Sequence, residues 1–237
     1  MKTFEDKTNY FLMKLKMRGR EIERKFLEVD TQDIEKRLQN AGAVEVFRGR
    51  VTSDYYSVRE QEEGLEFLSR VFGLRKEDII VGSGGAFSRL REMVDDDGTK
   101  IYSFETRVRE ITLGGISTTH ADVGDVCSLA SYRSLEGLHR DHPALQYRER
   151  EIKKRLVCIL PGFVGLEYAL DEILQPETVS PYLEIEVSGS DPSFELLLEG
   201  VRKLGLDETK LARTSARKLI GDGRARRSGG VEVVKLH

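Results

Sequence analysis

The stretch EIERKF, residues 21–26, decides how the rest of the sequence is interpreted. In a β-strand, successive side chains point to opposite sides of the sheet. Glu21, Glu23 and Lys25 would then share one face, while an isoleucine, an arginine and a phenylalanine share the other. A strand with two carboxylates and an ammonium along one face needs either open water or a charged partner beside that face.

The same design returns in several later segments. YLEIEV (182–187) places Glu184 and Glu186 on one face, opposite three aliphatic residues. Two carboxylates so placed lie about 7 Å apart, and at an effective dielectric constant of ~20 they repel each other by roughly 2 kcal/mol. Other segments also carry charges on one strand face: Arg89 and Arg91 in FSRLRE, Glu105 and Arg107 in ETRVR, Lys153 and Arg155 in KKR, and Glu167 and Asp171 in EYALD.

The set of charged faces indicates the fold. For any one strand, a solvated face on a one-sided sheet is the ordinary explanation. The opposite faces are strongly apolar, however, and helices can cover them, which would turn the charged faces toward one another. Strands that cluster in runs also indicate an antiparallel sheet. We therefore expect an α+β fold with a closed eight-stranded antiparallel β-barrel and helices packed outside it, whose interior has room for side chains or one small ligand.

Periodicity places the other elements. Apolar residues at helical spacing predict helices within residues 30–43 and 191–206, and a third helix is expected around residues 125–138. DDDG, residues 95–98, is expected to form a hairpin turn. HRDH, residues 139–142, is interpreted as a solvated loop.

Composition fits one folded domain. With 237 residues, of which 39% are hydrophobic and 33% are charged, the chain can bury a substantial core. Its 38 basic and 41 acidic side chains leave a net charge of −3, which disfavours a purely electrostatic nucleic-acid binder. Without a disulfide framework, a signal sequence or an apolar segment long enough to span a membrane, it is expected to be cytoplasmic with no membrane partner. We expect an extension at residues 1–19, the domain at 20–222 and a basic tail at 223–237.

These motifs resemble those of the CYTH family, also called the triphosphate tunnel metalloenzymes. Glu21, Glu23 and Lys25 match its N-terminal ExExK signature, and Glu184 and Glu186 match its ExE strand near the C-terminal end. The similarity spans residues 20–222, although residues 59–85 add a segment that family members usually lack. Other family features follow in the expected order: DYY at 54–56, the RxR of SRLRE, the basic strand IKKR and the strand that ends in Asp171.

The resemblance implies a tunnel that binds a triphosphate together with a divalent metal, Mg²⁺ or Mn²⁺. Carboxylate oxygens suit such hard cations, and arginines can hold phosphate oxygens bidentately. The implied metal ligands are Glu21, Glu23, Asp171, Glu184 and Glu186. The implied phosphate-binding residues are Lys25, Arg89, Arg91, Arg107, Lys153, Arg155 and Arg213. The catalytic set implied is Glu21, Glu23, Lys25, Glu184 and Glu186.

Three activities fit this resemblance. Hydrolysis of inorganic triphosphate, thiamine triphosphate or a nucleoside triphosphate is favoured. A cyclase that converts ATP to cyclic AMP and pyrophosphate is the alternative, because it would use the same tunnel with the ribose 3′-hydroxyl in place of water. A module that binds polyphosphate or an RNA 5′ end without turnover is the third. The substrate, the preferred metal and the oligomeric state, including a homodimer, stay open.

Overall fold

The computed structural model describes residues 20–58, 87–107, 110–113, 116–119, 122–175, 180–189 and 193–207, together with 66, 69 and 70. The predicted N-terminal extension, the predicted basic tail and Arg213 lie outside the described residues. Most of the added segment at 59–85 lies outside them as well. The predictions for these parts of the chain therefore stay predictions.

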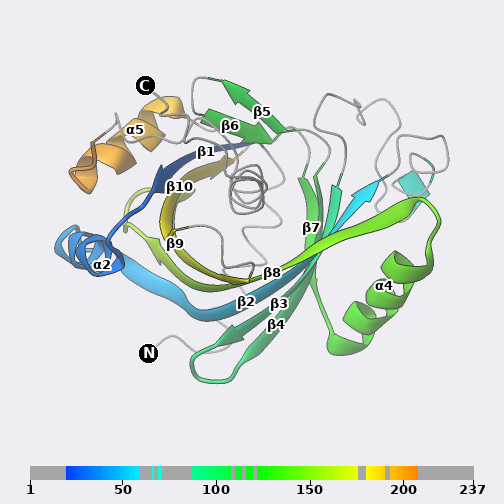
Figure 1. Cartoon of the computed structure of the whole chain (residues 1–237). Helices are drawn as coiled ribbons and strands as arrows, with labels where there is room; N and C mark the ends of the chain where they lie inside the picture. The colour runs from blue at the N-terminus through cyan, green and yellow to red at the C-terminus, as the bar shows by residue number, and fades with distance from the viewer. Residues whose placement is uncertain are drawn as a thin grey trace, which may run out of the picture.

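One antiparallel sheet dominates the structure (Figure 1). Its ten strands follow the order β5-β6-β1-β10-β9-β8-β2-β3-β4-β7. The two longest strands, β2 (Val44–Val58) and β8 (Leu145–Ile159), pair with each other near the middle of this order. The other strands are β1 (Arg20–Leu27), β3 (Phe87–Asp95), β4 (Lys100–Arg107), β5 (Glu110–Leu113), β6 (Ile116–Thr119), β7 (Asp122–Cys127), β9 (Leu166–Gln175) and β10 (Tyr182–Gly189).

The helices confirm the α+β class. They are α2 (Thr31–Asn40), α4 (Leu129–Asp141) and α5 (Phe194–Lys203), and each lies within or beside a predicted helical segment. Asp30, Ser128 and Ser193 cap their N-termini by accepting hydrogen bonds from backbone amides of the first turn. Within the described part of the chain, no helix combines the length and the apolar composition that crossing a bilayer requires.

The turn predicted at DDDG is confirmed between β3 and β4. Gly98 adopts a φ of 85°, a left-handed conformation that glycine tolerates because it has no Cβ. Its amide donates a hydrogen bond of 2.8 Å to the carbonyl of Asp95. The two strands of this hairpin are thereby fixed in register, with Arg89 opposite Glu105.

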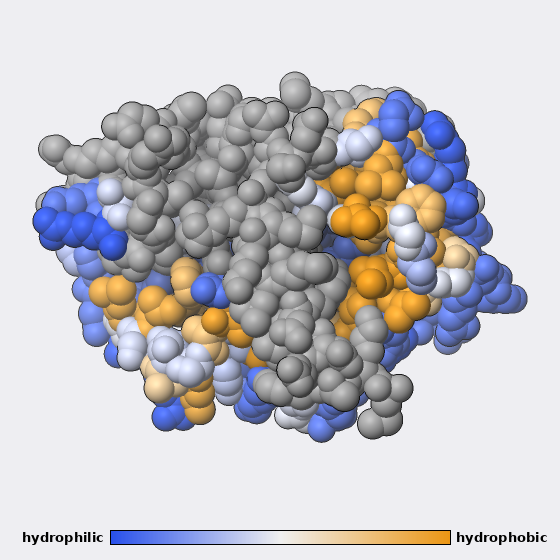
Figure 2. Space-filling view, turned by 180° about the vertical axis from the view of Figure 1, so that it is seen from behind, coloured by the Kyte–Doolittle hydropathy of each residue, from blue (hydrophilic) through white to orange (hydrophobic). Residues whose placement is uncertain are grey.

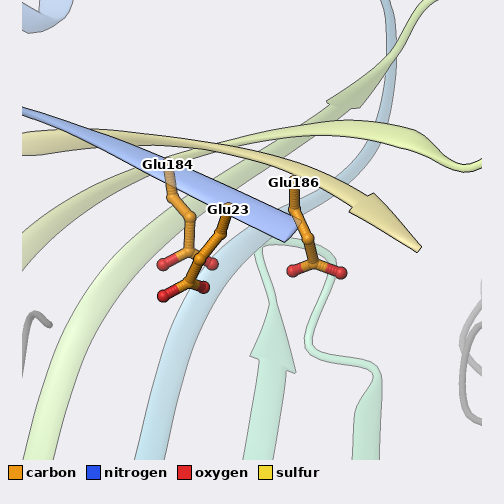
Figure 3. A group of neighbouring side chains, drawn as sticks. All are labelled: Glu23, Glu184 and Glu186. Atoms are coloured by element: carbon orange, nitrogen blue, oxygen red, sulfur yellow. The ribbon is translucent and has the colours of Figure 1, made fainter. Parts of the chain in front are cut away.

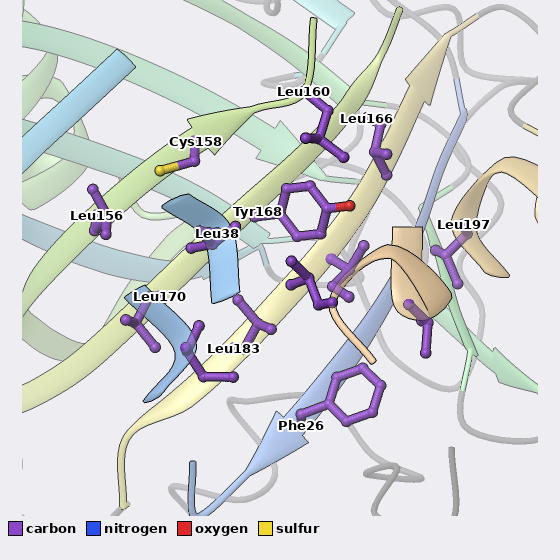
Figure 4. Packing of buried hydrophobic residues seen from close by; sticks show 14 of the residues in the cluster. Phe26, Leu38, Leu156, Cys158, Leu160, Leu166, Tyr168, Leu170, Leu183 and Leu197 are labelled. Carbon is purple, nitrogen blue, oxygen red and sulfur yellow. The ribbon is translucent and has the colours of Figure 1, made fainter. Parts of the chain in front are cut away.

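α2 and α5 cover one face of β1, β8, β9 and β10 (Figure 4). Leu38 of α2, Leu197 of α5 and Ile185 of β10 are at most 2% exposed in this core cluster. Helix α5 approaches the sheet closely at Gly200, where an added Cβ would lie 2.9 Å from Cδ1 of Leu166. Because the apolar residues of these strands face the helices, the alternate charged residues must face the opposite, concave side of the sheet.

The interpretation of HRDH as a solvated loop is wrong. Its first three residues end α4, and His139 is only 1% exposed. Nδ1 of His139 lies 2.8 Å from the carbonyl oxygen of Leu135, so it donates to that oxygen, and Nε2 accepts from the hydroxyl of Ser88 at 2.7 Å. Burial lowers the pKa of His139. This histidine therefore fastens α4 to β3 on the convex side.

A second correction concerns the concave face, which is not charged throughout. Val51 and Phe47 of β2, Met93 of β3, Ile101 of β4 and Val157 of β8 are buried together in an apolar cluster. On each of these strands, the polar or charged residues of the concave face give way to apolar ones on passing toward this cluster. The concave face therefore consists of a charged region bordered by an apolar one.

The described sheet differs from the predicted barrel in its number of strands and in its edges. The described residues form ten strands where eight were predicted, and two of the ten, β5 and β6, are only four residues long. The sheet curves strongly, so that β1, β10, β9, β8 and β2 partly encircle the concave side (Figure 1). Among the described residues, the edge strands β5 and β7 do not pair with each other. Closure into a barrel therefore stays a prediction.

Apolar side chains also reach the surface on the outside of the molecule. Seen from behind, they gather on the two flanks that carry α5 and α4 in Figure 1 (Figure 2). Exposed apolar residues of these helices include Phe194 of α5 and Leu129 and Leu138 of α4. Both helices pack against the convex side, so these patches do not border the charged face.

Candidate active site

Three glutamates converge on the concave face (Figure 3). Pairing of β1 with β10 places Glu23 opposite Glu186, and Lys25 opposite Glu184. One carboxylate oxygen from each of the three glutamates lies within 4.8 Å of the others. Glu23 and Glu186 are only 7% and 3% exposed. The ExExK and ExE motifs, far apart in the sequence, therefore form one buried cluster of carboxylates.

Lys25 holds this cluster together. Its ammonium forms ion pairs with Glu23 and with Oε2 of Glu184, the latter at 2.9 Å. Burial alone would lower the pKa of Lys25, but attraction to Glu184 and Glu23 outweighs it and raises the pKa above its ordinary value. Burial would likewise raise the pKa of Glu184, yet Lys25 and Arg155 hold it well below the usual range. Lys25 and Glu184 are therefore both ionised at neutral pH.

A clamp around Asp171 adjoins the glutamates. Arg155 donates two hydrogen bonds of 2.6 Å to the carboxylate of Asp171, and Lys153 donates one of 2.9 Å. Arg155 Nη2 also lies 3.7 Å from Oε1 of Glu184. Burial would raise the pKa of Asp171, but Arg155 and Lys153 lower it to about 2. Asp171 therefore serves to position two cations beside the glutamates.

This clamp predicts a loss of stability in acid. A carboxyl group whose folded-state pKa is depressed stabilises the protein above its ordinary pKa, and this contribution disappears as the pH falls through the folded value. For Asp171 the window runs from its ordinary 3.8 down to about 2. We expect the free energy of unfolding to fall steeply across this window, with the depressed pKa of Glu184 acting in the same direction.

Urea unfolding at a series of pH values between about 5 and 2 measures this effect. The Asp171→Asn variant should be less stable at neutral pH and should show a shallower decline in acid. A wild-type free energy of unfolding that is level across the window would contradict the assignment of Asp171 to an ionised clamp.

Two arginines of β3 complete the charged region. Arg89 forms an ion pair with Glu105 and donates to the hydroxyl of Tyr55 at 3.3 Å. Arg91 lies farther from Glu105, at 3.8 Å. Its Nε is buried, and among the described residues no group accepts a hydrogen bond from it. Burial and the nearby guanidinium of Arg89 lower the pKa of Arg91 to about 10, although Glu105 opposes this change. Arg91 is therefore a buried cation that its surroundings do not fully neutralise.

Solved structures share this architecture. The PH1012 protein of Pyrococcus horikoshii aligns with a TM-score of 0.57 and 16% identity, over 84% of this chain and 98% of that one. A protein of Vibrio parahaemolyticus, described as a "putative adenylate cyclase", aligns with a TM-score of 0.58 and 13% identity, over 86% of this chain and 98% of that one. No family model matches the sequence, and no curated protein matches it either.

The chain has the fold of CYTH-type proteins. The resemblance drawn from the glutamate motifs is confirmed at this level, since both alignments cover nearly the whole of the other chain. Identities this low show the fold alone, so what the chain does must be argued from its own residues.

The structure brings most of the predicted site residues together. Seven of them face the concave side as one network of charges: Glu23, Lys25, Glu184 and Glu186 in the carboxylate cluster, and Lys153, Arg155 and Asp171 in the clamp. Arg89 and Arg91 lie on the same face, across β2. Glu21 and Arg107 belong to β1 and β4, but their side chains lie outside the described residues, as does the whole of Arg213.

Three further residues of the charged region were not predicted as site residues. Glu105 of β4 pairs with Arg89, Glu151 of β8 lies beside Lys153, and Ser53 of β2 lies between Glu151 and Arg91. The alternation that placed Lys153 and Arg155 on one face extends back to Glu151 in the sequence. The alternation of side chains along the strand therefore could have placed Glu151 on the charged face, but it could not have given its function.

Proposed function

We propose that the protein hydrolyses a triphosphate with the help of a divalent metal. The observation that carries the proposal is the placement of three buried carboxylates and an incompletely neutralised arginine, Arg91, on one concave face. A carboxylate cluster alone suits a metal ion, and a buried arginine alone suits an anion. Both together suit an anion that arrives with its own metal, as polyphosphates do.

The donor atoms fit Mg²⁺ or Mn²⁺. The ligand group consists only of carboxylate oxygens, from Glu23, Glu184 and Glu186, and hard divalent cations prefer such oxygens. When bound, the metal would neutralise charge on the phosphate oxygens and polarise them. Lys25 forms ion pairs with two of these carboxylates, and these ion pairs would weaken when the carboxylates bind the metal. Asp171, another residue implied as a ligand, is occupied by Arg155 and Lys153.

Two arginines of the protein are placed to bind the phosphate groups. Arg91 and Arg155 face the same space from β3 and β8, and each can donate to phosphate oxygens through its guanidinium. Because Asp171 holds one edge of Arg155 through two hydrogen bonds, that guanidinium needs little reorganisation when an anion binds. Phosphoryl transfer requires mainly such positioning and charge neutralisation. Closely spaced fixed cations of this kind suit several linked phosphates better than one.

Cyclisation of ATP is the second candidate. The described Vibrio neighbour, a "putative adenylate cyclase", shares the fold along its length, which is the reason to test this activity. In this reaction the ribose 3′-hydroxyl attacks in place of water, on the same metal-bound triphosphate. The charged region serves either reaction, because neither nucleophile changes the charge that must be neutralised.

One assay separates the candidates. The purified protein is incubated with Mg²⁺ or Mn²⁺ and, in turn, with inorganic triphosphate, thiamine triphosphate, ATP and a triphosphorylated oligonucleotide. Phosphate release and cyclic AMP formation are both measured. We expect metal-dependent phosphate release from at least one of these substrates. Cyclic AMP and pyrophosphate from ATP would instead establish the cyclase. Tight triphosphate binding with no product of either kind would contradict both enzymes and leave a binding module.

A further inference from the structure

Three polar side chains, of which two are buried and the third, Arg91, is 15% exposed, form a row across the middle of the charged region. Glu151 of β8 is the cross-strand neighbour of Ser53 of β2, and Ser53 is the neighbour of Arg91 of β3. Cross-strand neighbours have Cβ atoms about 4.5–5.5 Å apart, so the three side chains adjoin. Ser53 and Glu151 are only 1% and 5% exposed. The row is therefore part of the protein interior and not a solvated surface.

Each member of this row has a buried polar atom that is left without a hydrogen bond. Within the part of the chain that the structure describes, none of Ser53 Oγ, Glu151 Oε1 and Arg91 Nε has a hydrogen-bond partner. Lys153 Nζ lies 3.1 Å from Glu151 Oε1 and forms an ion pair with it, but not a hydrogen bond. A buried polar group without a partner costs about 1–3 kcal/mol, so three in a row indicate a place for a ligand group.

The chemistry of the row defines that ligand group. Arg91 Nε can only donate, the Ser53 hydroxyl can donate or accept, and the Glu151 carboxylate can only accept. A phosphate oxygen suits Arg91 and Ser53 but is repelled by Glu151. An O–H group satisfies all three, because its hydrogen can point to Glu151 while its oxygen accepts from Ser53 or Arg91. Beside a bound triphosphate, an O–H group is the attacking nucleophile of both candidate reactions.

We propose that Ser53 and Arg91 hold the O–H group of the nucleophile and that Glu151 is the general base that removes its proton. This inference rests on the proposed function. As the oxygen of the nucleophile bonds to phosphorus, its proton passes to the Glu151 carboxylate. The P–O bond to the leaving phosphate group breaks, and the electron pair departs with that group. Glu151 then releases the proton to solvent.

The nucleophile can come from two sources that share this chemistry. With water, triphosphate becomes phosphate and diphosphate. With the ribose 3′-hydroxyl, ATP becomes cyclic AMP and pyrophosphate. The carboxylate lies beside Lys153, which the Asp171 clamp fixes, and this neighbour keeps Glu151 in place as the proton is transferred. Glu151 therefore has both the acceptor atom and the support that a general base needs.

The test compares Glu151→Gln with wild type under saturating metal, on whichever substrate the wild type consumes. Glutamine keeps the volume of the side chain but cannot take a proton. We expect kcat to fall by about 10²–10⁴-fold while KM changes by less than threefold, because Glu151 itself does not bind the phosphates. Glu151→Ala should lose as much activity and regain part of it when formate is added, since formate can occupy the space and accept the proton. Phosphate and cyclic AMP, measured side by side, identify the nucleophile.

The matched control is Glu172→Gln, an exposed carboxylate of β9 that pairs only at the surface with Lys154. It should keep wild-type kcat. Ser53→Ala is a second variant in case Glu151→Gln unfolds, and we expect it to lower kcat by about tenfold with KM unchanged. An active wild type together with a Glu151→Gln variant of similar kcat, or one that changes KM alone, overturns this inference. A wild type that consumes no triphosphate and forms no cyclic nucleotide contradicts the proposed function itself.

Discussion

The Glu184→Gln variant is expected to lose at least about 10²–10³-fold in triphosphate turnover while remaining folded. Glu184 belongs to the carboxylate cluster, accepts from Lys25 at 2.9 Å, and lies 3.7 Å from Arg155. Glutamine removes one of three negative charges and replaces one of the two carboxylate oxygens by an NH₂ group, which cannot bind a metal. Metal affinity should therefore fall together with turnover, and phosphate release measured over a range of Mg²⁺ concentrations checks both.

Thermal unfolding separates a metal effect from a structural one. Mg²⁺ with triphosphate should raise the melting temperature of the wild type and should do so much less in Glu184→Gln, because only the folded site binds the metal. The exposed Glu172→Gln variant is the matched control and should respond like the wild type. Full activity in Glu184→Gln at ordinary Mg²⁺ concentrations would show that the cluster holds no catalytic metal.

The Arg91→Met variant is expected to weaken substrate binding without weakening the fold. Arg91 is buried, its nearest carboxylate is 3.8 Å away, and its pKa is lowered to about 10 by burial and by Arg89. A charge-assisted hydrogen bond contributes about 1.5–3 kcal/mol, so its loss should raise KM for the triphosphate by about 10- to 100-fold. Because the charge is poorly compensated in the free protein, its removal should leave the melting temperature unchanged or higher.

Arg50→Met supplies the comparison for Arg91, since Arg50 lies on the neighbouring strand β2 but is exposed. It should change neither KM nor the melting temperature appreciably. Steady-state kinetics and thermal denaturation of both variants decide the matter. If Arg91→Met unfolds readily and binds triphosphate as well as the wild type, Arg91 serves the structure through an ion pair and the phosphate-binding role is wrong.

Much of the fold was predictable from periodicity alone. Alternation in EIERKF and YLEIEV specified which side chains share a face, and this property of a strand does not depend on its partners. The register of β1 against β10 then makes neighbours of Glu23 and Glu186. The starts of α2 and α5 are also local features, because Asp30 and Ser193 accept hydrogen bonds from backbone amides of their own first turns.

Other features depended on which strands become neighbours, which no single segment encodes. The described residues form ten strands where eight were predicted, because short strands such as β5 and β6 carry little periodic signal. The apolar cluster on the concave face combines Val51, Met93 and Val157 from three strands, and its position follows only from their registers. The sequence of each strand predicts which face of the sheet such a residue lies on, but it does not predict which residues of other strands lie next to it.

The roles of individual charges were harder still to predict. Arg91 and Arg155 occupy similar positions in basic strands, yet Asp171 neutralises Arg155 from 2.6 Å while Arg91 has no comparably close partner among the described residues. Asp171, which the resemblance implies as a metal ligand, pairs with Lys153 and Arg155 in the structure, and its local sequence did not indicate these two partners. The prediction that HRDH forms a solvated loop was wrong for the same reason. The hydrogen-bond partner of His139 is Ser88, which lies about fifty residues earlier in the chain.

The most direct measurement is anomalous diffraction from crystals grown with Mn²⁺ and a non-hydrolysable triphosphate. The predicted result is a manganese peak about 2–2.5 Å from carboxylate oxygens of Glu23, Glu184 and Glu186, with the phosphates between that ion and Arg91. A manganese peak away from these three carboxylates, or a triphosphate bound outside the concave face, would contradict the account.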